Sequence, residues 1–132
     1  MSLDDLTAVV VDDSAECLAF IVELTRMVGF QVRSFSCPLK ALHYVRENPV
    51  DVVFTDIRMP KMDGPTFIRE TRKIYNDIPI IIITGEPYTA ALKELASKVF
   101  AKPFQLEDFM DWVKPLSASI LAKKKERNSC GR

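Results

Sequence analysis

Five polar side chains of types that take part in phosphoryl transfer stand at the ends of short apolar runs in the sequence. They are Asp12, Asp13, Asp56, Thr84 and Lys102. Three carboxylates held close together repel one another, and a divalent cation relieves that repulsion. Mg²⁺ prefers such oxygen ligands and is often held by one or two carboxylates together with phosphate. If the fold brings these residues together, they predict a magnesium-dependent site for phosphoryl chemistry.

Each residue type has a role in that chemistry. An aspartate carboxylate can attack phosphorus and form an aspartyl phosphate, and a metal ion beside it neutralises charge on the incoming group. Lys102 would contact a phosphoryl oxygen as a compact positive charge, and Thr84 would donate a hydrogen bond to one. These residues are far apart in the sequence, so the elements that carry them must bring them together.

Five apolar runs alternate with stretches of helical periodicity, which predicts an α/β domain. The predicted strands are residues 8–11, 31–35, 52–54, 79–84 and 99–101. The four isoleucines before Thr84 are typical of a central strand that is covered on both faces. Alternating strands and helices imply a parallel sheet with right-handed crossovers. Ligands of such sheets bind beyond the carboxyl ends of the strands, and the five polar residues should converge there.

The helices have recognisable start and stop signals. We expect Asp13 to cap the first helix, with Glu16 three residues later, and Gly29 to end it. Ser36 is expected to cap the second helix. A short fourth helix fits residues 87–96.

Together, and in this order, these segments resemble the response-regulator receiver family of two-component signalling. The matching segments are residues 9–13, 54–56, 59–64, 82–85 and 102–104. The resemblance implies a single flavodoxin-like (βα)5 domain, with a five-stranded parallel sheet in the order 2-1-3-4-5 and helices on both faces. We expect the receiver domain to span residues 5–121. Residues 122–132 would form a polar C-terminal tail or the start of a linker.

The resemblance also implies a role for each acidic residue. Asp56 would be the phosphoacceptor, taking its phosphoryl group from a phosphohistidine on a sensor histidine kinase or a phosphotransfer protein. Asp13 and Asp56 would ligate Mg²⁺ together with the backbone carbonyl of Arg58. Asp12 would act largely through a metal-bound water.

The remaining two residues would respond to the phosphoryl group. Thr84 would move towards it, and Lys102 would bind one of its oxygens; the resemblance further implies a cis bond between Lys102 and Pro103. A receiver switches conformation to control a partner or effector. It catalyses only its own phosphorylation and dephosphorylation, so we do not expect an enzyme that acts on a separate substrate.

The sequence departs from the family pattern at the output side. Val99 occupies the switch position, three residues before the site lysine, where the family usually has an aromatic residue. The segment between Thr84 and Lys102 is also shorter than is usual. The family resemblance therefore predicts the phosphorylation site but not the output surface formed by the fourth helix, fifth strand and fifth helix. A homodimer could form through this surface.

Arg58 and Glu86 are candidates for tuning the site, because each lies two residues after a site residue. Our hypothesis is that the two side chains pair across the mouth of the site and hinder attack by water. The alternative is that they are two independent surface charges.

Composition excludes several other classes of protein. Lys plus Arg equals Asp plus Glu at 18 each, so a net charge of zero gives no general attraction to nucleic acid. We expect no direct nucleic-acid binding within these residues, and no apolar run is long enough for a membrane span. The three cysteines include no CxxC pair, which indicates a reducing compartment and a cytoplasmic location.

Two alternative functions stay open at this point. An aspartate-nucleophile phosphatase also places its nucleophile at a strand end, but in an Asp-x-Asp pattern after the first strand. Asp12 and Asp13 have no spacer between them. A pseudo-receiver that acts only as an interaction module would not need the complete set of acid, threonine and lysine side chains.

Overall fold

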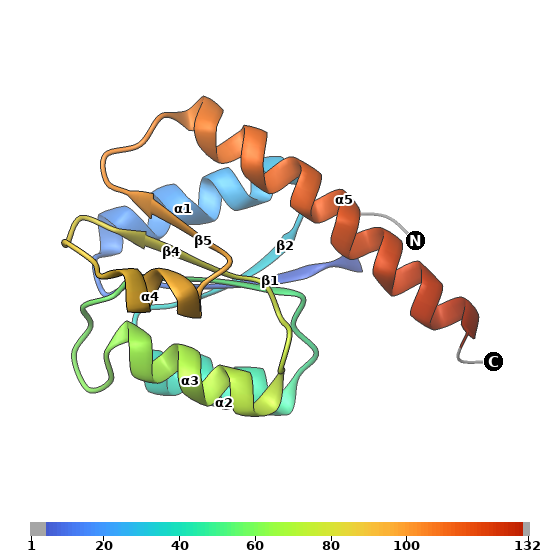
Figure 1. Ribbon diagram of the computed structural model, residues 1–132, viewed down its shortest axis with the longest axis horizontal. Helices are drawn as coiled ribbons and strands as arrows, with labels where there is room; N and C mark the ends of the chain where they lie inside the picture. Colours follow the sequence, from blue (N-terminus) through green and yellow to red (C-terminus); the bar gives the residue numbers. More distant parts are fainter. Residues whose placement is uncertain (1–4, 131–132) are drawn as a thin grey trace.

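Five strands alternate with five helices in the computed structural model, which describes residues 5–130 and the side chains of residues 5–127 (Figure 1). The strands are β1 (Thr7–Val11), β2 (Gln31–Phe35), β3 (Val52–Thr55), β4 (Ile80–Thr84) and β5 (Lys98–Ala101). The helices are α1 (Ala15–Val28), α2 (Pro38–Glu47), α3 (Gly64–Ile74), α4 (Ala90–Leu95) and α5 (Leu106–Cys130). The predicted α/β fold class is confirmed.

All strand pairs in the sheet are parallel, and their order is β2-β1-β3-β4-β5, as predicted. The register decides which strand ends meet. Val11 lies opposite Thr55, so the chain leaves β1 and β3 at neighbouring points. Thr84 lies opposite Ala101, so Lys102 follows at the same level. This register brings the carboxyl ends of four strands to one edge.

The sheet is covered on both faces, with α1 and α5 on one side and α2, α3 and α4 on the other (Figure 1). Successive side chains of a strand point to opposite faces. Phe54 and Phe100 therefore join the core beneath α1 and α5, while Val53 and Val99 join the core beneath α2, α3 and α4. Val99 and Phe100, although adjacent in β5, therefore face opposite sides of the sheet.

Two predicted helix caps are wrong by one residue. The N-cap of α1 is Ser14, not Asp13: the Ser14 hydroxyl accepts a hydrogen bond from the backbone N–H of Cys17 at 3.4 Å. The N-cap of α2 is Cys37, not Ser36, and makes no side-chain cap bond. Because Asp13 precedes the cap, its carboxylate is free to take part in the site. Gly29 does end α1, with φ 122° in the left-handed range that favours glycine.

The last two helices differ in length. The α4 helix has six residues, starts at the Thr89 cap and buries Leu92, in line with the short fourth helix predicted for this segment. The α5 helix continues past Pro115 to Cys130, so residues 122–130 extend this helix. The Lys124 ammonium lies 3.3 Å from Oδ2 of Asp51, which anchors the extension at the amino edge of the sheet, just before β3.

No helix in the part of the chain that the structure describes is both long and apolar enough to cross a lipid bilayer.

Candidate functional site

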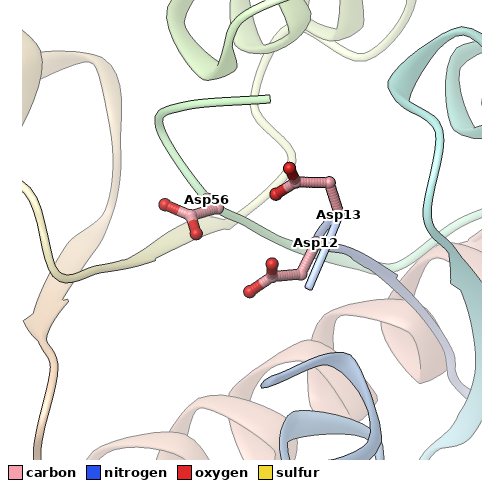
Figure 2. Close-up of side chains that lie close together, drawn as sticks. All are labelled: Asp12, Asp13 and Asp56. Atoms are coloured by element: carbon pink, nitrogen blue, oxygen red, sulfur yellow. The ribbon is translucent and has the colours of Figure 1, made fainter. Parts of the chain in front are cut away.

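Three carboxylates meet at the carboxyl edge of the sheet, as the sequence predicts. Asp12 and Asp13 follow β1, Asp56 follows β3, and the three side chains point into a common space (Figure 2). One carboxylate oxygen from each residue lies within 4.8 Å of the others. Asp12 is buried, Asp56 is partly buried and Asp13 is exposed, so the cluster opens to solvent on one side.

Backbone hydrogen bonds fix Asp12 at the end of β1. Its N–H donates to the carbonyl of Phe35 at 3.1 Å, which continues the ladder to β2 for one residue. Its Oδ1 accepts from the N–H of Ser14 at 2.9 Å, forming a tight turn into α1. The second oxygen, Oδ2, is left to face the site.

Asp56 is held in the same way at the end of β3. Its N–H donates to the carbonyl of Val11 at 3.2 Å, which ties it to β1. Its Oδ1 accepts from the N–H of Ile57 at 2.6 Å. One carboxylate oxygen is therefore fixed by the backbone, and Oδ2 points towards Lys102.

Gly64 permits a close approach of two chain segments behind Asp56. Its N–H donates to the carbonyl of Ile57 at 2.6 Å. A Cβ at this position would lie 2.2 Å from the backbone oxygen of Asp56 and 2.8 Å from Cα of Ile57. The start of α3 can therefore pack against the backbone of the site only because residue 64 has no side chain. Residue spacing placed Gly64 only at the end of the 59–64 segment and did not predict this role; the signal was its position directly after Asp63, the N-cap of α3.

Lys102 places its ammonium group between two of the carboxylates. Its Nζ lies 3.0 Å from Oδ2 of Asp12 and 3.2 Å from Oδ2 of Asp56. Burial by itself lowers the pKa of Lys102, but hydrogen bonds and charge attraction from Asp12 and Asp56 outweigh it and raise the pKa above its ordinary value. The cation is therefore permanent at neutral pH, and it offsets part of the repulsion among the carboxylates. The bond from Lys102 to Pro103 is cis, as predicted.

Thr84 lies at the end of β4 with no exposed surface. Its Oγ1 accepts a hydrogen bond from the backbone N–H of Glu86 at 3.0 Å, and its carbonyl accepts from the N–H of Lys102 at 2.7 Å. The threonine hydroxyl is thus tied to the β4–α4 loop in this structure. Its backbone is tied to the segment that carries the lysine.

Arg58 and Glu86 form the ion pair that the spacing suggested. The Arg58 Nη2 lies 3.6 Å from Oε2 of Glu86, which joins the loop after β3 to the loop after β4. Their side chains are 80% and 42% exposed, so the pair lies in solvent, where such pairs contribute little to stability. The pairing is confirmed, and its effect on water attack stays a prediction.

The donor set fits a hard divalent cation. Three carboxylates that each offer an oxygen within one small space, open to solvent on the side of Asp13, match the oxygen-rich and partly hydrated surroundings that Mg²⁺ requires. The single positive charge of Lys102 leaves the cluster with a net negative charge. The site is therefore capable of binding a metal ion.

Comparison with known proteins agrees with this geometry. A family model described as the response regulator receiver domain matches residues 8–114. The transcriptional regulatory protein PrrA from Mycobacterium tuberculosis is 32% identical over 111 residues, which cover 81% of this chain and 48% of PrrA. The chain thus spans about half the length of that relative.

Solved structures show the same likeness. A response regulator receiver domain protein from Clostridium thermocellum is 30% identical, with a TM-score of 0.75 over 91% of this chain and 97% of its own. The response regulator TrrA from Thermotoga maritima, crystallised in complex with Mg²⁺-BeF, is 25% identical, with a TM-score of 0.76 over 84% of this chain and 98% of its own.

Receivers are signalling modules rather than classical enzymes, and the acidic pocket of Asp12, Asp13 and Asp56 is typical of their phosphoacceptor site. The family model and the sequence relative agree with the 2-1-3-4-5 sheet and with the carboxylates at its strand ends. This chain therefore belongs to the response regulator receiver domain family.

Proposed function

We propose that Asp56 accepts a phosphoryl group from a phosphohistidine on a partner kinase or phosphotransfer protein. The observation that carries this proposal is the meeting of three carboxylates within 4.8 Å, with the Lys102 ammonium between two of them. A partly buried carboxylate beside a fixed cation is placed to attack an electrophilic phosphorus, because the cation offsets charge as the anionic group approaches.

The chemical step is a transfer between two nucleophiles. A carboxylate oxygen of Asp56 forms a bond to phosphorus while the bond from phosphorus to the histidine nitrogen breaks. The nitrogen keeps the electron pair of that bond and becomes a neutral imidazole after proton exchange with solvent. Lys102 stabilises the negative charge on the phosphoryl oxygens throughout, and the backbone N–H of Ile57 keeps the attacking carboxylate oriented.

Mg²⁺ is the cofactor that we assign to the acidic cluster. Asp13, Asp56 and the backbone carbonyl of Arg58 would hold the ion, and Asp12 would contribute through an intervening water. When bound, the ion supplies positive charge that stabilises the phosphoryl oxygens in the transition state. The Mg²⁺ in the structure of the Thermotoga response regulator supports this choice for a chain of the same family.

Phosphorylation of Asp56 would increase the negative charge beside Thr84 and Lys102. An aspartate carries one negative charge, and a phosphoryl group at neutral pH carries about −1.5 to −2 with new acceptor oxygens. Lys102 would bind one of these oxygens. Thr84 would release the N–H of Glu86 and turn its hydroxyl towards another, so the β4–α4 loop is the first segment to respond.

Arg58 and Glu86 would set the lifetime of the phosphorylated state. Their ion pair spans the mouth between the two loops. A water molecule that attacks the phosphorus must enter through this mouth, so the pair would slow hydrolysis by limiting its access.

The wider setting of the domain is also a proposal. The receiver unit would span residues 5–121, and the rest of α5 would lead into a linker. A homodimer could form through α4, β5 and α5, where the groove lined by Tyr88, Lys98, Phe100 and Trp112 offers a surface. Cys17 and Cys37 are free, which supports a reducing compartment such as the cytoplasm.

A labelling experiment tests the proposed function. The protein is incubated with Mg²⁺ and acetyl phosphate, and we expect a phosphate label that is stable in acid, labile in base and absent from Asp56→Asn. Failure of the wild-type protein to take up label would favour a pseudo-receiver. Rapid turnover of an added phosphoester would instead favour a phosphatase.

A further inference from the structure

We propose that the state of Asp56 is transmitted to α5 by a cluster of aromatic rings that begins at Phe104 and ends at Trp112. This inference rests on the proposed phosphorylation of Asp56 and concerns what that event does to the rest of the domain. It assigns the output path to the face of the sheet beneath α1 and α5.

The path starts at Lys102, whose contacts must change on phosphorylation. In the present structure its ammonium is shared between Asp12 and Asp56. A phosphoryl group on Asp56 places new anionic oxygens beside this ammonium, so the lysine exchanges a carboxylate partner for a phosphoryl oxygen. The backbone N–H of Lys102 is bound to the carbonyl of Thr84 at 2.7 Å, so movement of either site residue is passed to the segment after β5.

Phe104 lies two residues after Lys102 and is packed among other rings. Its ring centroid lies 5.6 Å from that of Phe100, 5.9 Å from that of Phe109 and 6.0 Å from that of Phe20. Ring pairs at these separations favour defined relative orientations. A shift of the segment that begins at Lys102 therefore cannot leave Phe104 unaffected, and its neighbours must adjust.

Trp112 is the far end of the cluster. Its ring meets that of Phe100 edge-on, with centroids 6.3 Å apart and an interplanar angle of 85°. Phe100 also carries the ammonium of Lys98 at 5.4 Å from its ring centre. Both Phe100 and Trp112 line the groove between β5 and α5, so a change in the ring cluster alters the shape of an accessible surface.

A second connection joins the same cluster to the phosphoacceptor strand. Phe54 lies in β3 two residues before Asp56, and its ring centroid is 5.9 Å from that of Phe109. The rings thus contact β3, the strand that leads directly to Asp56, and the segment that holds Lys102. Val99, in contrast, points into the core beneath α2, α3 and α4 and contributes no ring there.

The single tryptophan of the chain makes this proposal measurable in the intact protein. Trp112 is half-buried and reports on its own surroundings through its fluorescence. Beryllofluoride with Mg²⁺ serves as the probe for the phosphorylated state, and ¹⁹F NMR shows independently whether it is bound. We expect a bound ¹⁹F signal and a saturable change in Trp112 emission in the wild type, with neither in Asp56→Asn.

Variants of Phe104 then separate binding from transmission. Phe104→Leu should keep the bound ¹⁹F signal and lose most of the emission change, by several-fold or more, whereas Phe104→Tyr keeps the ring and should keep the change. Phe104→Met, which fills the space with a flexible side chain, provides a second ring-free test if the leucine variant does not fold. The matched control is Phe35→Leu, because the Phe35 ring pairs with Tyr44 on the other face of the sheet.

The outcomes distinguish the two proposals. Bound beryllofluoride without a change in Trp112 emission, or a full change in Phe104→Leu, would overturn the ring path and leave the phosphoacceptor proposal intact. No bound beryllofluoride in the wild type would overturn the phosphoacceptor proposal and this inference with it.

Discussion

The ammonium nitrogen of Lys102 lies 3.2 Å from Oδ2 of Asp56, although the two residues are 46 positions apart in the sequence. The same nitrogen contacts Asp12, so one lysine neutralises part of a cluster that would also hold a metal ion. The lysine and the metal therefore act on the same carboxylates, and each should affect how strongly the other is bound.

Replacing Lys102 with methionine should tighten Mg²⁺ binding. The substitution removes a positive charge that lies 3.0 Å from Asp12 and 3.2 Å from Asp56, two of the carboxylates proposed to serve the metal site. At an effective dielectric constant of about 20, a charge this close to those carboxylates matters on the scale of kcal/mol. We expect an increase in affinity of about tenfold by isothermal titration calorimetry. Lys124→Met is the matched control, because Lys124 pairs with Asp51 at the opposite edge of the sheet. Unchanged or weaker binding in Lys102→Met would show that the lysine does not compete with the metal.

Replacing Gly64 with alanine should destabilise the domain. The new Cβ would collide with backbone atoms of Asp56 and Ile57, which cannot move aside as a flexible side chain would. Overpacking of this kind costs about 1–3 kcal/mol. In urea unfolding, Gly85→Ala is the control, since its Cβ would lie in ordinary van der Waals contact, 3.9 Å from the Cβ of Lys102. Equal free energies of unfolding for the two variants would contradict the close approach seen here.

The Asp63 cap of α3 should make a contribution to stability that depends on pH. Hydrogen bonds from the side chain and the backbone of Thr66 hold the pKa of Asp63 below its usual range. A lowered pKa in the folded state means that the stabilisation is present above the ordinary aspartate value, about 3.9, and is lost as the pH falls through the folded value.

The test compares the wild type with Asp63→Asn, which keeps a capping oxygen but not the charge. At pH 6 the wild type should be more stable by roughly 0.3–1 kcal/mol, the usual effect of a negative charge at a helix N-terminus. This difference should vanish as the pH falls below the lowered pKa of Asp63 in the folded protein. Asp77→Asn, at an exposed carboxylate outside the helix, serves as the control. A difference that does not change with pH would argue against the charge of Asp63 as its source.

Arg58→Ala and Glu86→Ala should each speed the loss of phosphate from the labelled protein. Because the pair is exposed, it is worth at most about 1 kcal/mol, which corresponds to an increase of up to about fivefold in rate. The double variant should be no faster than either single variant, since each removes the same interaction. The control is Arg46→Ala, which breaks a comparable surface pair with Glu70. Dephosphorylation rates that match the wild type in both single variants would exclude a tuning role.

The sequence predicted the convergence of the site because strand ends in a parallel sheet share one edge. Asp12, Asp56, Thr84 and Lys102 each follow an apolar run, and the register of β1 with β3 and of β4 with β5 brings them together. The same reasoning predicted the pairing of Arg58 with Glu86, because each lies two residues after a site residue at the end of a strand.

Other features depend on side-chain packing and could not be predicted from spacing. Asp and Ser are both strongly favoured N-cap residues, so the choice of Ser14 over Asp13 depends on where α1 begins, which spacing alone does not determine to within one residue. The need for glycine at position 64 depends on how closely α3 approaches the backbone of Asp56. The rings of Phe104, Phe100 and Trp112 come from separate segments, and no periodicity relates them.

The role of Asp56 as phosphoacceptor is tested by locating the phosphoryl group after labelling with acetyl phosphate and Mg²⁺. Borohydride reduces an aspartyl phosphate to homoserine, and mass spectrometry of the peptides then identifies the modified residue. If Asp56 is the phosphoacceptor, Asp56 alone is converted, and Asp12 and Asp13 stay unmodified. Conversion of Asp12 or Asp13 in place of Asp56, or of none of the three, would contradict this role.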